Sequence, residues 1–151
     1  MDNREVGLSV IKNRIINDKD TLNVKSIWRN SNEPIDKSML NAVYIFEGED
    51  SIIKHANNNF LGYPARRLLE VEIELVTTID RDGKGIKTFY QNLRRAVLCD
   101  KIDDIYTPNP ILADDVIIRE LRTYGAHPYS TPGLIGMKMV LGLQYIDNFI
   151  S

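Results

Sequence analysis

The chain has 151 residues, a formal net charge of −2 at pH 7 and 26% charged residues, the composition of an ordinary globular protein. This length predicts a single domain over residues 1–151 that can bury a core without a metal ion or a disulfide bond. The sequence has no lysine and arginine run, which excludes the usual electrostatic signature of a nucleic-acid binder, and its single cysteine excludes an internal disulfide. The polar first residues and the short apolar runs predict neither a signal peptide nor a membrane span, so we expect a protein made in a reducing cytoplasm.

The first predicted element is a helix over residues 3–17. Its apolar residues, Ile11 among them, recur at helical spacing and form a broad stripe. Asp2 or Asn3 can cap the helix by accepting hydrogen bonds from its first free amide groups. Gly7 is expected to weaken the first turn by about 1 kcal/mol relative to alanine.

Two strands and a long connection are predicted next. Residues 23–28 alternate imperfectly and indicate a short edge strand. Residues 41–47 are β-branched and aromatic and are apolar on both faces, which indicates an inner strand or one covered by a neighbouring subunit. Residues 48–64 are polar and contain a run of three asparagines, so we expect a loop that is either mobile or occupied by a partner.

The stretch from residue 66 to residue 98 has the clearest pattern in the chain. Residues 66–79 alternate between apolar and polar side chains, as in a strand with one buried face. The apolar face carries Leu69, Val71, Ile73, Leu75 and Ile79, and the other face carries Glu70, Glu72 and Glu74. A polar turn over residues 80–85 then leads into a predicted helix whose apolar residues, Phe89 and Leu93 among them, can cover the dry face of the strand.

The last third of the chain is predicted to hold two further strands. Residues 100–115 indicate an irregular excursion, and residues 125–136 a loop rich in glycine, proline and serine. Residues 115–124 and 137–145 have the composition and alternation of strands. Because the order of elements has no strand–helix–strand repeat, it predicts an α+β fold, with an antiparallel sheet of about four to five strands and two helices packed on one face.

Motifs for metal, phosphate and nucleophilic chemistry are incomplete. The acidic turn that begins at Asp80 resembles a calcium-binding loop, but Lys84 and Gln91 stand where such a loop needs ligands. Residues 83–88 lack the spacing of a phosphate-binding loop. Neither histidine has a second ligand at a suitable spacing, and Cys99 falls where a helix ends in the core. We therefore predict no catalytic residue, no cofactor and no metal ion, and a protein that is not an enzyme.

The glutamate row is the strongest candidate for an interaction surface. A carboxylate row at strand spacing is either a solvated sheet face or a surface that meets lysine and arginine residues of another subunit. Arginine pairs at the start of the strand and on the helix favour a ring of subunits that pairs such rows across its seams, each pair adding little unless it is partly buried. The candidate interface residues are Arg66, Arg67, Glu70, Glu72, Glu74, Arg94, Arg95, Tyr124 and His127.

These segments together resemble the tail terminator proteins of long-tailed bacteriophages, also called tail-completion or minor tail proteins. The likeness runs from Val6 to Tyr145 and is a likeness in the order of elements rather than in one sharp motif. It is carried by the N-terminal helix with Ile11, Ile15 and Ile16, by the basic start and acidic strand of residues 67–75, by the turn and helix of residues 80–98, by residues 116–124 with Gly125, and by residues 141–145.

The resemblance implies a structural function in the virion. It implies α+β subunits that form a hexameric ring at the head-proximal end of the tail tube and end tube polymerisation, after assembly in the host cytoplasm. The implied partners are copies of the chain itself, the tail tube protein and a neck or head-completion protein, and DNA passes through the lumen without specific binding and without involvement of a membrane. An acidic lumen would repel passing DNA, and the candidate lumen-facing residues are Asp103, Asp104, Asp114 and Asp115.

Two alternatives remain open at this point. The first is another head–tail connector or a tail-tube-like subunit, which would share the fold class. The second is a small-molecule-binding or enzymatic α+β domain, which would lack the ability to assemble. A ring on a sizing column favours the virion protein, and a stable monomer with a deep apolar pocket favours the binding domain.

Overall fold

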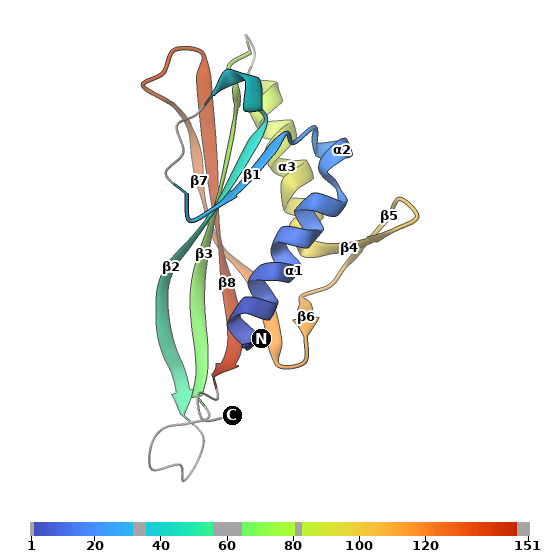
Figure 1. Ribbon diagram of the computed structural model, residues 1–151, viewed down its shortest axis with the longest axis vertical. Coiled ribbons are helices and arrows are strands. Elements are labelled where there is room, and N and C mark those ends of the chain that lie inside the picture. Colours follow the sequence, from blue (N-terminus) through green and yellow to red (C-terminus); the bar gives the residue numbers. More distant parts are fainter. Residues whose placement is uncertain (1, 32–35, 56–64, 81–82, 148–151) are drawn as a thin grey trace.

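The computed structural model describes residues 2–31, 36–55, 65–80 and 83–147 (Figure 1). Three helices and eight strands lie in these ranges, together with one short 3-10 turn over Lys37–Met39. The helices are α1 (Asn3–Asn17), α2 (Lys19–Leu22) and α3 (Lys84–Leu98), and the strands are β1 (Ser26–Arg29), β2 (Ala42–His55), β3 (Ala65–Thr78), β4 (Cys99–Ile102), β5 (Ile105–Pro108), β6 (Ile111–Ala113), β7 (Val116–Pro128) and β8 (Leu134–Asp147). In the described part of the chain, no helix is both long enough and apolar enough to cross a membrane.

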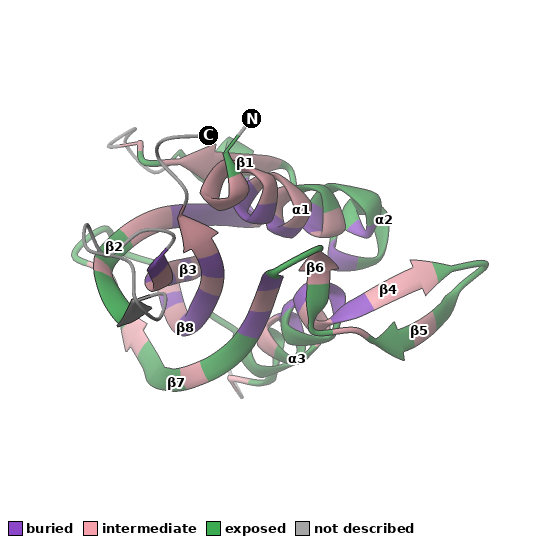
Figure 2. Ribbon diagram, turned by 90° about the horizontal axis from the view of Figure 1, so that it is seen from below, coloured by how far each residue is buried: buried purple, intermediate pink, exposed green. Residues whose placement is uncertain are grey.

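A six-stranded sheet dominates the molecule. Its strand order is β1-β2-β3-β8-β7-β6, and it is mixed because β1 runs parallel to β2 while the other neighbours are antiparallel. The sheet curls into a half-barrel around α1 and α3 (Figure 2). The predicted fold class is therefore wrong, because it expected an antiparallel sheet of four to five strands with two helices on one face. Alternation within single strands carries no information on how many strands pair or how strongly the sheet curls.

The long β2–β3 hairpin replaces part of a predicted loop. β2 continues through residues 48–55 and pairs with β3 as far as the His55–Ala65 pair, with register shifts between Glu47 and Asp50 and between Ile52 and Lys54. The loop prediction is wrong for these residues, since backbone pairing with β3 supports a strand whose side chains do not alternate cleanly. The rest of the predicted loop, residues 56–64, lies outside the described residues.

Two further predicted irregular segments are also largely regular. The expected excursion over residues 100–115 contains a separate two-stranded hairpin, β4–β5, and the short strand β6. The expected loop over residues 125–136 is mostly strand, because β7 runs to Pro128 and β8 begins at Leu134. Asp103 and Asp104 make the two-residue β4–β5 turn with φ values of 51° and 62°, and such left-handed turns suit the right-handed twist of a hairpin.

The core lies on the face of the sheet that α1 and α3 cover. The predicted alternation of the central strand is confirmed for four of its apolar residues, because Leu69, Val71, Ile73 and Leu75 of β3 are all 0% exposed. Ile79 was expected on the same face, but it lies beyond the end of β3 and is 50% exposed, so this part of the prediction is wrong. The predicted second helix is confirmed as α3, which buries Ile86, Phe89, Leu93, Ala96 and Val97.

A smaller apolar cluster lies on the opposite face. It contains Leu40, Ala42, Tyr44, Val76 and Leu134, with Trp28, Phe46 and Tyr129 packed at its margin. This cluster explains why residues 41–47 are apolar on both faces, because the first half of β2 is covered on both sides and lies between β1 and β3. The predicted edge strand is confirmed as β1, with its bounds shifted toward Arg29.

Helix α1 has the predicted bounds, and Asp2 caps it by accepting a 2.7 Å hydrogen bond from the amide of Glu5. Gly7 is buried where this helix touches the sheet. A Cβ atom at Gly7 would lie 2.6 Å from Cδ1 of Leu143 and 3.0 Å from Cγ1 of Val116. The glycine thus permits a close helix–sheet contact, a reason for it that the helical pattern did not reveal.

Gly7→Ala is expected to lower the free energy of unfolding by about 1–3 kcal/mol through overpacking against Leu143. Urea denaturation of the purified variant measures this change. Gly125→Ala is the matched control, because a Cβ atom at Gly125 meets nothing within 4 Å, and we expect no loss of stability from it. A gain of about 1 kcal/mol at Gly7, the ordinary helix preference for alanine, would contradict the close contact.

Candidate functional site

The face of the sheet turned away from α1 and α3, which we call the open face, carries the predicted glutamate row. Each glutamate contacts a side chain of the same molecule. Glu70 accepts hydrogen bonds of 3.1 and 3.3 Å from Nη1 and Nη2 of Arg122. Glu72 lies 3.6 Å from Nζ of Lys138. Glu74 accepts a hydrogen bond from the hydroxyl of Tyr129.

These contacts change the expected character of the row. Arg122 of β7 and Lys138 of β8 already neutralise two of its charges, and His127 Nε2 lies 3.6 Å from Oε1 of the third, Glu74. Hydrogen bonding to Glu70 and Tyr124 raises the pKa of Arg122, so that cation keeps its charge at every accessible pH. A neighbouring subunit would therefore meet a face of paired charges, on which each added ion pair contributes little.

Tyr124 and His127 join the glutamates on the open face, as two members of the predicted interface set. The Tyr124 ring is 47% exposed, and it lies between two cations, 5.8 Å from the Arg122 guanidinium carbon and 5.4 Å from Nζ of Lys138. The imidazole of His127 packs against the ring of Tyr129 with the centroids 5.1 Å apart. The open face thus combines paired charges with exposed aromatic surface.

Of the four predicted arginines, Arg66 alone lies on the same face of β3 as the glutamate row. Arg66 and Arg67 are neighbours in β3, so their side chains point to opposite faces of the sheet, and Nε of Arg67 lies 3.0 Å from Oδ1 of Asp50 on the helix-covered face. Arg94 donates hydrogen bonds to Glu120, and the guanidinium of Arg95 lies 3.9 Å above the ring of Tyr106. Whether these residues form a subunit interface stays a prediction.

The four predicted lumen-facing aspartates lie in two separate hairpin turns. Asp103 and Asp104 form the β4–β5 turn, and the Asp104 side chain is 95% exposed, 3.6 Å from Nζ of Lys101. Asp114 and Asp115 are exposed in the turn between β6 and β7, where Asp115 has a φ of 59°. Both turns are acidic and exposed, and the expectation that they face the lumen of a ring stays a prediction.

Sequence reasoning missed a polar network on the helix-covered face, at the N-terminal end of α1. Asp50 is its centre: Arg4 Nη1 lies 2.7 Å from Oδ2, Arg67 Nε lies 3.0 Å from Oδ1, and the Tyr145 hydroxyl donates a 2.5 Å hydrogen bond to Oδ2. Arg4 also donates a 2.8 Å hydrogen bond to Glu47. This network depends on the register shift between Glu47 and Asp50 in the pairing of β2 with β3. The shift brings both carboxylates to one face of the sheet, whereas strict alternation would place them on opposite faces.

Glu47 extends the network toward β1. It accepts a hydrogen bond from Asn30 and lies 3.3 Å from Nη2 of Arg29, which also pairs with Glu5 of α1. Burial by itself would raise the pKa of Glu47, but hydrogen bonds from Arg4 and Asn30 hold the pKa below its usual value. The network ties α1, β1, β2, β3 and β8 together and has the character of a structural clamp.

Ionisation of the Tyr145 hydroxyl is expected to lower the stability of the protein at alkaline pH. Burial and the hydrogen bond to Asp50 raise the pKa of Tyr145 to about 12. An unfolded tyrosine ionises near pH 10, so the stabilising contribution is complete below about pH 10 and is lost as the pH rises toward 12. We expect thermal melts to show a steep loss of stability in this window. Tyr145→Phe should show a shallower loss, and an identical pH profile would contradict the role of Tyr145.

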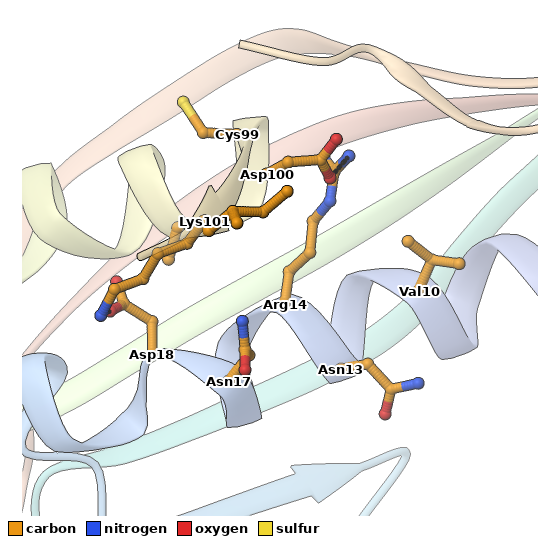
Figure 3. Close-up of a pocket in the computed structure, with 10 residues that line it drawn as sticks. Val10, Asn13, Arg14, Asn17, Asp18, Cys99, Asp100 and Lys101 are labelled. Atoms are coloured by element: carbon orange, nitrogen blue, oxygen red, sulfur yellow. Dashed lines mark hydrogen bonds and ion pairs between the residues drawn. The ribbon is translucent and has the colours of Figure 1, made fainter. Parts of the chain in front are cut away.

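A groove of about 380 Å³ lies between α1 and β4 (Figure 3). Its lining includes Val10, Asn13, Arg14, Asn17, Asp18, Cys99, Asp100 and Lys101. The charged residues of the lining pair with one another: Arg14 Nη2 lies 3.0 Å from Oδ1 of Asp100, and Lys101 Nζ lies 2.7 Å from Oδ1 of Asp18. Within the described residues, no set of three or more metal-ligating side chains gathers, here or elsewhere.

The β4–β5 hairpin (Cys99–Pro108), which we call the arm, leaves the body of the molecule beside this groove (Figure 1). Its anchor is Asp18, a carboxylate only 1% exposed at the end of α1. Asp18 Oδ1 lies 2.7 Å from Nζ of Lys101 in β4, and its two oxygens accept hydrogen bonds of 2.9 and 3.0 Å from the hydroxyl of Tyr106 in β5. Because both strands of the arm bind one buried carboxylate, the arm is fixed to α1.

The comparisons with known proteins give one finding at the level of the fold. No known family model matches the chain, and no curated protein matches it. A chain from the virion of a native gene transfer agent particle has a similar structure, with a TM-score of 0.55 and 11% sequence identity, covering 91% of this chain and 92% of that chain. The two chains share a fold along nearly their whole lengths.

Proposed function

We propose that the chain is a virion structural protein that forms a ring, of six copies, at the head-proximal end of a phage tail tube. There it ends tube polymerisation and joins the tail to the neck or head-completion proteins. The observation that carries the proposal is the fold shared over 91% of the chain with a component of a gene transfer agent virion. The finer role comes from the tail terminator resemblance of residues 67–98 and of the strands that follow them.

The geometry of the molecule supports a function exerted by surfaces. The groove beside α1 is lined by charges that already pair with each other, so a small ligand would have to displace them. Exposed features are plentiful by contrast: the open face, the arm and the two acidic turns. A ring uses such features in a heterologous contact that closes by rotation, with the tail tube on one side and the neck on the other. DNA would cross its lumen without specific binding, repelled by Asp114 and Asp115 of the exposed turn between β6 and β7.

The test is assembly on tail tubes. Purified chain is mixed with tail tubes that lack their head-proximal end proteins, and tube length and end structure are followed by electron microscopy. We expect a ring at one end of each tube and an arrest of further growth at that end. Tubes that keep growing, with a chain that stays monomeric and unbound, would contradict the proposal.

Another head–tail connector ring is the second candidate. The same shared fold favours it, because the likeness is to a component of a virion and is equally compatible with any ring between head and tail. Localisation in assembled particles separates the two candidates. A labelled chain seated directly on the tube end supports the terminator role, and a label on the head side of the neck supports the connector role.

A further inference from the structure

The tip of the arm exposes apolar side chains that its own molecule does not cover. Ile102 and Ile105 flank the β4–β5 turn and are 71% and 66% exposed, among the largest values for apolar residues of the described chain. Between them lie Asp103 and Asp104, which make the tip acidic as well as apolar. Side chains of this size at a projecting tip are typical of a contact with another molecule.

The arm is held rigidly enough to present this tip. Lys101 and Tyr106, one from each strand, bind the buried carboxylate of Asp18, and the guanidinium of Arg95 stacks 3.9 Å from the Tyr106 ring. These contacts fix the arm against α1 and α3 at the Lys101–Tyr106 pair, which is next to the Ile102–Ile105 pair of the tip. A preorganised arm loses little conformational entropy when its tip docks.

A complementary surface lies on the opposite flank of the molecule. β1 pairs with β2 only over Ala42–Ile45, so the second half of β2 forms an edge of the sheet within the described residues. Ile52 and Ile53 lie in that half and are 43% and 48% exposed. Arg66 of β3 lies at the end of this segment, because it pairs with Lys54, while Ile52 pairs with Arg67. The arm and β2 lie on opposite sides of the molecule in both views (Figures 1 and 2).

We infer that the arm tip of one copy docks on the Ile52–Ile53 segment of a second copy, which we call the acceptor edge. This inference rests on the proposed ring and names its seam. The isoleucines at the tip cover those of the edge, and Asp103 and Asp104 meet Arg66 of the second copy. Because tip and edge lie on opposite flanks, each copy can donate one arm and accept another, as a closed ring requires. An arm-to-arm contact would instead bring four aspartates of like charge together.

Two double variants test the contact from its two sides. Ile102→Thr/Ile105→Thr removes the apolar tip, and Ile52→Thr/Ile53→Thr removes the acceptor edge, while threonine keeps the β-branched character that strands favour. Sedimentation velocity on each variant should show self-association weakened roughly thirtyfold or more, from the loss of buried apolar surface. Circular dichroism melts should be unchanged, since these side chains are exposed within their own molecule.

A mixture of the two variants gives the sharper result. The tip variant keeps an intact edge and the edge variant keeps an intact tip, so an equal mixture should form pairs that grow no further. Ile79→Thr/Ile111→Thr is the matched control, because these side chains are 50% and 59% exposed but belong to neither surface, and it should assemble normally. Asp103→Asn/Asp104→Asn should weaken assembly, and Arg66→Gln should add little to that variant, because both changes remove the same charge contact.

The outcomes separate this inference from the proposed function. Rings that form equally well from the tip variant, or a mixture that forms no pairs, would overturn the docking of arm on edge and leave the proposed function intact. A wild-type chain that stays monomeric both alone and on tail tubes would overturn the proposed function and the seam with it.

Discussion

Leu93→Ala is expected to lower the free energy of unfolding by about 2–5 kcal/mol, because it deletes buried methyl groups and leaves a cavity that the core refills only in part. Leu93 is 0% exposed at the middle of α3 and belongs to the core cluster that joins both long helices to the sheet. Ile73→Ala, in the centre of β3 and also 0% exposed, should have an effect of similar size. Urea denaturation monitored by circular dichroism measures both changes.

Ile79→Ala is the control for this experiment. The alternation of residues 66–79 places Ile79 on the same face as Ile73, but the side chain is 50% exposed in the structure. We expect its free energy of unfolding to change by less than about 0.5 kcal/mol, as for most surface substitutions. Equal losses from Ile73→Ala and Ile79→Ala would show that the strand extends further into the core than the structure places it.

Asp18→Asn is expected to destabilise the protein by about 2–4 kcal/mol, since it removes the negative charge from a buried site that holds a cation. The carboxylate is 1% exposed and accepts hydrogen bonds from both Lys101 and Tyr106. A neutral amide cannot compensate the ammonium charge, and its NH₂ group cannot accept a hydrogen bond. Urea denaturation gives the loss of stability, and hydrogen exchange should show faster exchange of the amides along the arm.

Asp104→Asn is the matched control, because Asp104 contacts the same lysine at 3.6 Å but has a side chain that is 95% exposed. Its stability should match that of the unchanged chain, as expected for an exposed ion pair. The double variant Asp18→Asn/Lys101→Met should recover part of the lost stability, because it removes the uncompensated charge as well. Equal stability of the Asp18 and Asp104 variants would contradict the anchoring role of Asp18.

The core substitutions and the Asp18 substitution test different parts of the molecule, the core and the attachment of the arm. The Leu93 and Ile73 substitutions weaken the core, so they should reduce folding and assembly together. The Asp18 substitution loosens the arm while the core cluster stays complete. If the arm forms the seam between subunits, Asp18→Asn should impair ring assembly at temperatures where the body of the protein remains folded.

Local periodicity was sufficient to predict the elements whose residues repeat one pattern throughout. Helix α1 begins and ends at the predicted residues 3 and 17, and the apolar face of β3 and the buried stripe of α3 are confirmed. In each case the burial pattern follows from the geometry of a single helix or strand. The same reasoning failed for residues 48–55 and 100–113, where strands form because partner strands pair with them.

The candidate site divides in the same way. Alternation placed Glu70, Glu72 and Glu74 on one face of a strand, and the structure places them on the open face. The alternation gave no indication that Glu70 would pair with Arg122, 52 residues later in the chain, or that Glu72 would pair with Lys138. Nor did it indicate the network around Asp50, which depends on a register shift between β2 and β3.

The amino-acid sequence by itself determined which side chains share a face of each helix and strand, because that depends only on the chain's own repeat of 3.6 or two residues. The tertiary structure alone decided the curl of the six-stranded sheet, the parallel placement of β1, the pairing of the glutamates and the projection of the arm. Those features depend on contacts between residues far apart in the chain, and the local pattern of a segment does not specify which distant segment it pairs with.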